Sequence, residues 1–137
     1  STRPYQHVLE PLSVYLMLAA RQAEHAALVG AWNVGPDDAD CVTTGELADL
    51  FCQAWGAGTR WETHADGGPH EAHFLKLDCS KVKSALGWRP HWHIAEAVEK
   101  TVEWAKAWEE GADMRALTEE QIEVFFAGDH RAGREIG

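Results

Sequence analysis

Two histidine clusters are the groups in this 137-residue sequence whose spacing first suggests chemistry. His70, Glu71 and His73 form one cluster, and His91 and His93 form the other. Imidazoles two or three residues apart can chelate zinc. Neither cluster has the i, i+4 spacing of a metal-binding helix, and no third ligand is specified. We therefore predict no metal site, and we assign no catalytic residue.

The glycines and tyrosines give no pattern for a nucleotide cofactor. A phosphate-binding loop needs glycines that open a helix, as in GxxGxxG or GxxxxGK[ST]. Gly56 and Gly58 instead follow a predicted helix, and neither Tyr5 nor Tyr15 is followed four residues later by the lysine of dehydrogenase chemistry. We expect this chain to hold no cofactor by itself.

Arg3 is a candidate for anion binding. It precedes Pro4 and the first predicted helix, and an arginine on a loop can bind a phosphate through two parallel hydrogen bonds. The alternative is a solvated side chain near the start of the chain.

Composition narrows the class of protein. The chain has 22 acidic and 12 basic side chains, a net charge of -10, and 45% apolar residues. This charge argues against a nucleic acid or membrane partner, and no apolar run reaches the length of about 18 residues that a membrane helix needs. Three cysteines without a C-x-x-C motif indicate free thiols and a cytoplasmic protein. The length fits one compact domain.

The elements that position these residues follow from hydrophobic periodicity. Alternation and turn signals predict strands at 31–35, 60–64 and 73–78. Helical spacing and caps predict helices at 9–27, 44–55, 80–86, 94–109 and 119–127. Strands and helices alternate over 31–63 and the remainder is mainly helical, so the fold class is α/β with few short strands.

Several local signals support these boundaries. Helix 9–27 is apolar on nearly all sides, which predicts burial on several faces. Thr43 with Glu46, and Thr118 with Gln121, each match a capping box that opens a helix.

The aromatic content is unusual. The chain has seven tryptophans, more aromatic surface than a small core easily hides, so we expect some to face a ligand, a partner or another domain. Trp104 and Trp108 are four residues apart on helix 94–109 and are expected in the core.

Three strings carry a resemblance to a known family. They are RPYQHVLEPLSVYLML at 3–18, AWNVGPDDAD at 31–40 and PHEAHFLKLDCSKVKSALGWRPHW at 69–92. Together they resemble the C-terminal part of the CDP-glucose 4,6-dehydratases, which are extended short-chain dehydrogenase/reductase proteins of the NAD-dependent epimerase/dehydratase group. The resemblance covers nearly the whole chain.

The resemblance implies a longer enzyme. Such enzymes have an N-terminal Rossmann domain that binds NAD and a smaller C-terminal domain that binds the nucleotide sugar. They oxidise the sugar at C4, eliminate water across C5–C6 and return the hydride to C6. The glycine fingerprint, the Tyr-x-x-x-Lys pair and the acid/base pair of that family are not in this sequence. We therefore expect no catalysis by this chain alone.

The resemblance also implies roles for five residues. Arg3 matches the arginine that contacts the nucleotide diphosphate, and His7 matches a histidine that orients the loop. Asn33 matches a residue near the sugar-nucleotide cleft. His70 and Glu71 fall where relatives carry a second phosphate-binding arginine, and His70 would replace part of that contact.

Two hypotheses follow for function. The first is a nucleotide-sugar-binding C-terminal domain at 1–127, with 1–35 packing on a Rossmann sheet outside this chain and a flexible tail at 128–137. The second is an oligomeric interaction protein without activity. In both, the apolar helix 9–27 needs a cover, which predicts a homodimer or larger assembly.

Overall fold

The computed structural model describes the backbone of residues 1–64 and 74–132 and the side chains through residue 128. In this part the chain is mainly helical. The order of elements is β1 (Thr2–Arg3), α1 (Leu9–Gln22), η1 (Ala26–Leu28), η2 (Asp38–Asp40), β2 (Val42–Thr43), α2 (Thr44–Trp55), α3 (Ser80–Leu86), α4 (Ile94–Glu109) and α5 (Met114–Ala132). The two strands are short, so the α/β class holds only as a mainly helical fold with little sheet.

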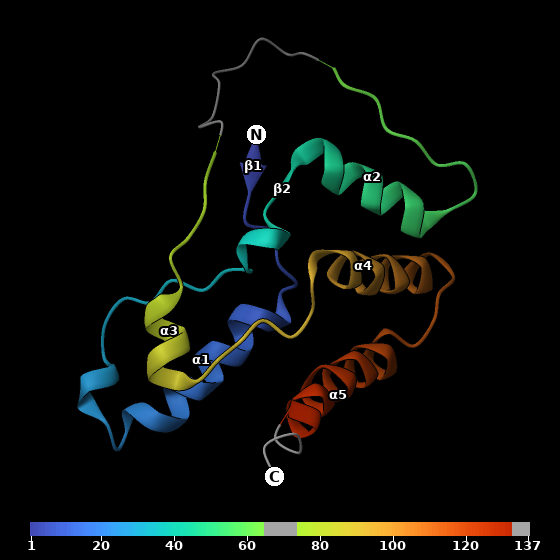
Figure 1. Ribbon diagram of the computed structural model, residues 1–137. Helices are drawn as coiled ribbons and strands as arrows, with labels where there is room; N and C mark the ends of the chain where they lie inside the picture. The colour runs from blue at the N-terminus through green and yellow to red at the C-terminus, as the bar shows by residue number, and fades with distance from the viewer. Residues whose placement is uncertain (65–73, 133–137) are drawn as a thin grey trace.

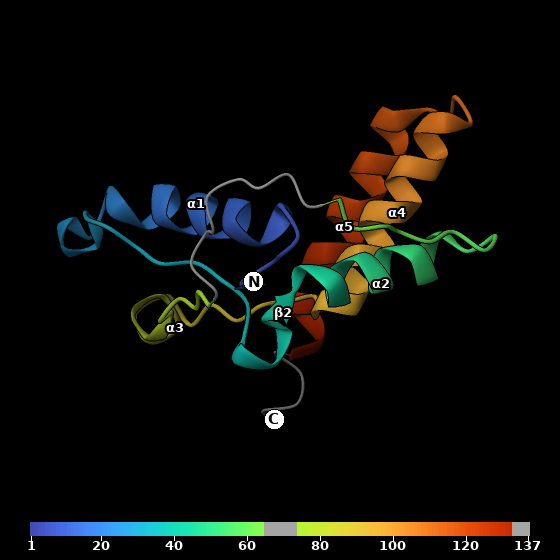
Figure 2. The same cartoon turned by 90° about the horizontal axis from the view of Figure 1, so that it is seen from above.

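The helices form two groups that lie side by side. Helices α1 and α3 pack together on one side of the molecule, and α2, α4 and α5 lie on the other with α4 in the middle (Figures 1 and 2). Strands β1 and β2 pair antiparallel, with Thr2 opposite Thr43 and Arg3 opposite Val42. Phe74 adds an isolated bridge to Thr2. The sheet thus ties the start of the chain to the start of α2.

The α1/α3 group has a core of aliphatic side chains around one indole. Its buried residues are Val14, Leu18, Cys79, Val82, Leu86 and Trp88. The Trp88 indole N–H donates to Ser13 Oγ at 3.1 Å, and that hydroxyl donates to the Glu10 carbonyl at 2.7 Å. Every polar group of this chain of contacts therefore has a partner, as burial requires.

The α2/α4/α5 group has a smaller core made largely of rings. Trp92, Ala97 and Phe125 are buried and Leu9 packs against them. The Trp92 and Phe125 rings meet edge to face at 5.0 Å, and the His91 ring stacks on Phe125 at 4.1 Å. Such ring contacts add to the stability that area burial provides.

Local chemistry explains the three helices that the sequence predicted well. Helix α2 begins at the Thr43–Glu46 capping box, in which Glu46 N donates to Thr43 Oγ1 and Thr43 N donates to Glu46 Oε2. Helix α3 spans 80–86 as predicted and ends at Gly87, whose φ of 67° favours glycine. Helix α4 spans 94–109 as predicted.

The first helix is shorter and more exposed than predicted. It ends at Gln22 instead of residue 27. Beyond its end the chain forms the short helix η1, and Gln22 Nε2 donates to the Leu28 carbonyl there. Its buried stripe is Glu10, Ser13, Val14 and Leu18. Tyr15 and Leu16 are 61% and 64% exposed. The expectation of burial on several faces is therefore wrong for the described chain.

The last helix is longer than predicted. It begins at Met114, because the Asp113 carboxylate accepts hydrogen bonds from Arg115 N and Ala116 N. Thr118 lies inside the helix and donates to the Met114 carbonyl, so the second capping box is wrong. The helix runs to Ala132, which places part of the predicted tail in regular structure; residues 133–137 lie outside the described residues.

The predicted strands do not form as such. Residues 31–35 and 60–64 are irregular, and of 73–78 the described part carries only the bridge at Phe74. Trp108 is 59% exposed instead of lying in the core. No helix within the described residues is long and apolar enough to cross a membrane.

Candidate functional site

Residues 91–94, which lead from α3 into α4, form the junction between the two helix groups. A buried carboxylate fixes this segment. Glu10, in the first turn of α1, is fully buried, and its Oε1 accepts hydrogen bonds from His91 N and Trp92 N, each at 2.8 Å. Its Oε2 lies 3.4 Å from His91 Nδ1. A carboxylate that binds two backbone N–H groups is a strong, directional acceptor. Glu10 therefore fixes the segment that leads from α3 into α4.

A second buried carboxylate acts at the same segment. Asp40, which is 4% exposed, accepts from Ile94 N at 3.0 Å and lies 2.8 Å from His93 Nδ1. The hydrogen bond to Asp40 raises the pKa of His93 above its usual value. The two histidines considered as zinc ligands in the sequence thus pair with separate carboxylates, His91 with Glu10 and His93 with Asp40.

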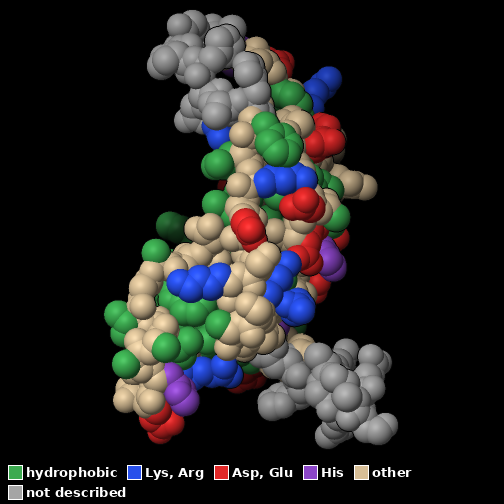
Figure 3. All heavy atoms as spheres, turned by 60° about the vertical axis from the view of Figure 1, so that its left-hand side comes forward, with side chains coloured by type: hydrophobic (Ala, Val, Ile, Leu, Met, Phe, Trp, Pro, Cys, Tyr) green, Lys and Arg blue, Asp and Glu red, His purple; other side chains and the backbone are tan. Residues whose placement is uncertain are grey.

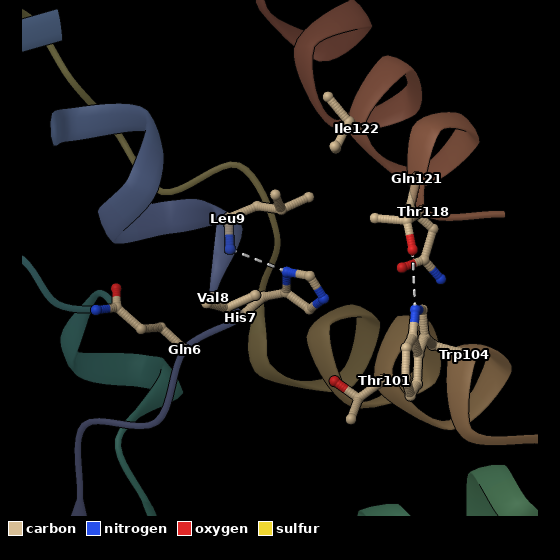
Figure 4. Close-up of a pocket in the computed structure, with 9 residues that line it drawn as sticks. All are labelled: Gln6, His7, Val8, Leu9, Thr101, Trp104, Thr118, Gln121 and Ile122. Carbon is tan, nitrogen blue, oxygen red and sulfur yellow. Dashed lines mark hydrogen bonds between the residues drawn. The ribbon is translucent and has the colours of Figure 1, made fainter. Parts of the chain in front are cut away.

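His7 lies between the junction and a cavity. Its Nδ1 accepts the backbone N–H of Leu9 at 3.2 Å, and its ring meets Trp92 edge to face at 4.8 Å. Burial lowers the pKa of His7, with Glu10 acting weakly in the opposite sense. The Leu9 contact orders the backbone where α1 begins, and the other edge of the ring faces a cavity formed with α4 and α5 (Figure 4).

The other predicted binding residues have different surroundings. Arg3 lies on β1, opposite Val42 of β2. Asn33 uses its amide to donate to the Asp78 carbonyl at 3.2 Å, which ties residues 31–35 to the start of α3. His70 and Glu71 lie outside the described residues. Of these residues, His7 lines the cavity of Figure 4, whereas Arg3 and Asn33 are not among the residues that line it.

The sequence reasoning missed the buried polar residues that organise this region. Glu10 occupies the same helical stripe as Val14 and Leu18, at i, i+4 and i+8. A charged residue on the buried stripe was the available signal. Asp40 and Gln121 had no comparable signal, because their burial depends on contacts between segments far apart in the sequence.

Comparison with known proteins shows what this chain is similar to. No protein-family model matches it. Its sequence is similar to that of a nucleotide-sugar dehydratase, as the sequence strings suggested. That relative is CDP-glucose 4,6-dehydratase of Salmonella typhimurium, which is 42% identical over 132 residues. The match covers 96% of this chain and 37% of the relative, so the chain spans little more than a third of the relative's length.

Proposed function

We propose that this chain is the substrate-binding portion of a CDP-glucose 4,6-dehydratase-like protein. The observation that carries the proposal is the 42% identity to that enzyme over 96% of the chain. The reaction itself would need the NAD-binding and Tyr-x-x-x-Lys elements, which this sequence does not contain. Catalysis then belongs to a longer protein or to a partner that supplies those elements. The alternative of an interaction protein without this function is not favoured by the homology.

Within this proposal, Arg3 binds the diphosphate of the nucleotide sugar. Its guanidinium can make two parallel hydrogen bonds to phosphate oxygens. Asn33, His70 and Glu71 are proposed to contribute further contacts to the nucleotide sugar, while His7 orders the loop between Arg3 and α1. The backbone pairing of β1 with β2 supports this assignment, because it holds Arg3 on a fixed strand.

We also propose that the exposed apolar face of α1 is covered in the working protein. Leu12, Tyr15 and Leu16 are each more than 40% exposed, and hydrophobic side chains reach the surface between lysines and arginines on the side shown in Figure 3. In the longer protein the cover would be the NAD-binding domain. For the chain alone we expect a homodimer or larger assembly, and Leu16→Lys should shift it toward the monomer in light scattering. A stable wild-type monomer at micromolar concentration would contradict the assembly.

Calorimetry with CDP-glucose tests the binding proposal on this chain. We expect weak, saturable binding in the millimolar range that Arg3→Ala reduces about tenfold, since a charged hydrogen bond of this kind contributes about 1.5–3 kcal/mol. The matched control is Arg115→Ala, because Arg115 is an exposed arginine of α5 that pairs with Glu119. Absence of heat at millimolar ligand, or equal binding by both variants, would overturn the assignment.

A further inference from the structure

A cavity of about 320 Å³ lies between residues 6–9, α4 and α5 (Figure 4). Its walls are mostly apolar and include Val8, Leu9, Ile122 and the indole of Trp104. The size falls in the range of small-molecule sites, which are also mainly apolar with a few placed polar groups. A diphosphate would lose its hydration here without gaining a cation, so the cavity does not suit a nucleotide sugar.

The first polar group in the cavity is a hydrogen-bond donor. The Leu9 N–H donates to His7 Nδ1, so the neutral imidazole carries its proton on Nε2. The contact of the ring with Trp92 fixes its orientation. Figure 4 shows the Nε2 edge of His7 facing the side of the cavity formed by α4 and α5. The contacts among the described residues leave this N–H without a partner.

The second polar group is an acceptor. Gln121 on α5 is 6% exposed, and its Nε2 donates to the Lys100 carbonyl at 2.9 Å and to Glu103 Oε2 at 3.3 Å. Both N–H groups of the amide are used, which leaves Oε1 as the free atom. In Figure 4 this oxygen lies on the side of the amide that faces His7.

The hydroxyl protons in the walls are already used in hydrogen bonds, so the hydroxyls offer no donor to a ligand. Thr101 donates to the Ala97 carbonyl at 2.8 Å. Thr118 donates to Met114 O and accepts the indole N–H of Trp104 at 3.1 Å. The Gln6 amide also belongs to the lining, but in Figure 4 it points away from the other lining residues, and its Nε2 donates to the Val34 carbonyl. Among the lining groups, His7 Nε2–H is then the donor that faces the apolar space, and Gln121 Oε1 is the amide acceptor on the opposite side.

We propose that this cavity binds a small uncharged molecule that joins an apolar ring to a carboxamide or lactam group. The carbonyl oxygen of the ligand accepts from His7 Nε2–H, its N–H donates to Gln121 Oε1, and its ring packs against Trp104 and Ile122. This cavity is not the diphosphate site of the proposed function, although His7 has a part in both: its Nδ1 orders the loop that follows Arg3, and its Nε2 faces the cavity.

Three probes of similar size test the proposal on the wild-type chain by NMR titration. Benzamide offers both hydrogen bonds, ethylbenzene offers neither, and benzoate carries a charge and no N–H. We expect saturable shifts of the His7 and Gln121 side chains with benzamide. We expect at least tenfold weaker binding of ethylbenzene and benzoate. Equal binding of ethylbenzene, or no benzamide binding up to its solubility limit, would overturn the proposal.

Several substitutions test whether benzamide binds in this cavity, so the result does not depend on a single variant. Ile122→Trp fills the cavity and should abolish benzamide binding. Val124→Trp is the matched control, because Val124 is an exposed apolar residue of the same helix that does not line this cavity. His7→Phe keeps a ring and removes the donor, and should weaken binding about tenfold. Benzamide shifts that persist unchanged in Ile122→Trp would place the probe elsewhere and refute the site.

Discussion

The α1/α3 group and the α2/α4/α5 group are stabilised in different ways. The first buries aliphatic side chains around Trp88, but it leaves one face of α1 exposed. The second buries Trp92 and Phe125 beside the small α4 residues Ala97, Val98 and Val102, and it adds contacts among the rings of His91, Trp92 and Phe125. Each core is small, and a small core gives little net stability by itself.

Two buried carboxylates join the two groups, beside the apolar packing of Leu9 of α1 in the second core. Glu10 accepts the backbone N–H groups of His91 and Trp92, and Asp40 accepts that of Ile94. We expect the two small cores to unfold together, because two buried carboxylates fix the segment between them. Substitutions at the junction should then have larger effects than substitutions within either core.

The largest effect is expected at Glu10. Glu10→Leu leaves two buried backbone N–H groups without an acceptor, and we expect the free energy of unfolding to fall by about 4 kcal/mol. Urea unfolding followed by circular dichroism measures this loss. Glu24→Leu is the control, since Glu24 follows the same helix and is exposed. A loss below about 1 kcal/mol would show that the junction does not couple the groups.

The next effect tests the aliphatic core. Leu86 is 5% exposed and packs in the α1/α3 group. Leu86→Ala should cost about 3 kcal/mol, from lost burial and a cavity. If the groups are coupled, tryptophan fluorescence and circular dichroism will report one transition at the same urea concentration. Two separate transitions would contradict coupling. Leu75→Ala, at an exposed site, should change little.

The sequence predicted the elements whose signals are local. Helices α2, α3 and α4 have caps, terminal glycines or a clear apolar stripe within their own residues. The start of α5 was missed because Thr118 and Gln121 mimic a capping box, whereas Asp113 provides the observed cap. Residues 31–35 have strand-like composition, but a strand needs a partner, and their polar groups bind Lys81, Asp78 and Gln6 instead.

The candidate site was less predictable than the helices. The motif strings identified Arg3, His7 and Asn33, because the resemblance supplies roles for these positions. They could not identify Gln121, which lies more than 100 residues from His7 in the sequence and lines the same cavity. Nor could they show that the Asn33 amide contacts the backbone of Asp78. Such assignments depend on packing between distant segments.

A smaller effect is expected at the start of α2. Thr43→Ala removes the side chain that accepts from Glu46 N at 3.2 Å, and should cost about 1 kcal/mol. Because the Thr43 side chain bonds to Glu46 and not to residues 91–94, the loss should leave the transition cooperative. Thr59→Ala is a control at an exposed threonine beyond the other end of α2, where the hydroxyl donates to the Gly56 carbonyl at 2.7 Å and does not cap the start of the helix. A loss of unfolding free energy as large as that of Glu10→Leu would contradict the expectation that the junction contributes more than a helix end.

The smallest expected effect is on the pH dependence of stability, to which two histidines near the junction contribute. The pKa of His93 is raised by Asp40, whereas burial lowers the pKa of His7. Stabilisation from protonated His93 is therefore complete below its unfolded value of about 6.5 and is lost as pH rises through the raised folded pKa. His7 has the opposite sign, since stability falls as pH decreases below about 6.5 toward its lowered pKa.

The opposite pH dependences of His93 and His7 can be measured directly. The His93 side chain is 74% exposed, so its contribution should be less than about 1 kcal/mol. The stability difference between wild type and His93→Gln should then be present at about pH 5.5 and absent at about pH 8.5. NMR titration should order the pKa values as His93 above His7, and Asp40→Asn should lower only that of His93. A His93 pKa that does not move in Asp40→Asn would mean that Asp40 acts on Ile94 N alone. The junction would then depend on backbone hydrogen bonds and not on the charge of either histidine.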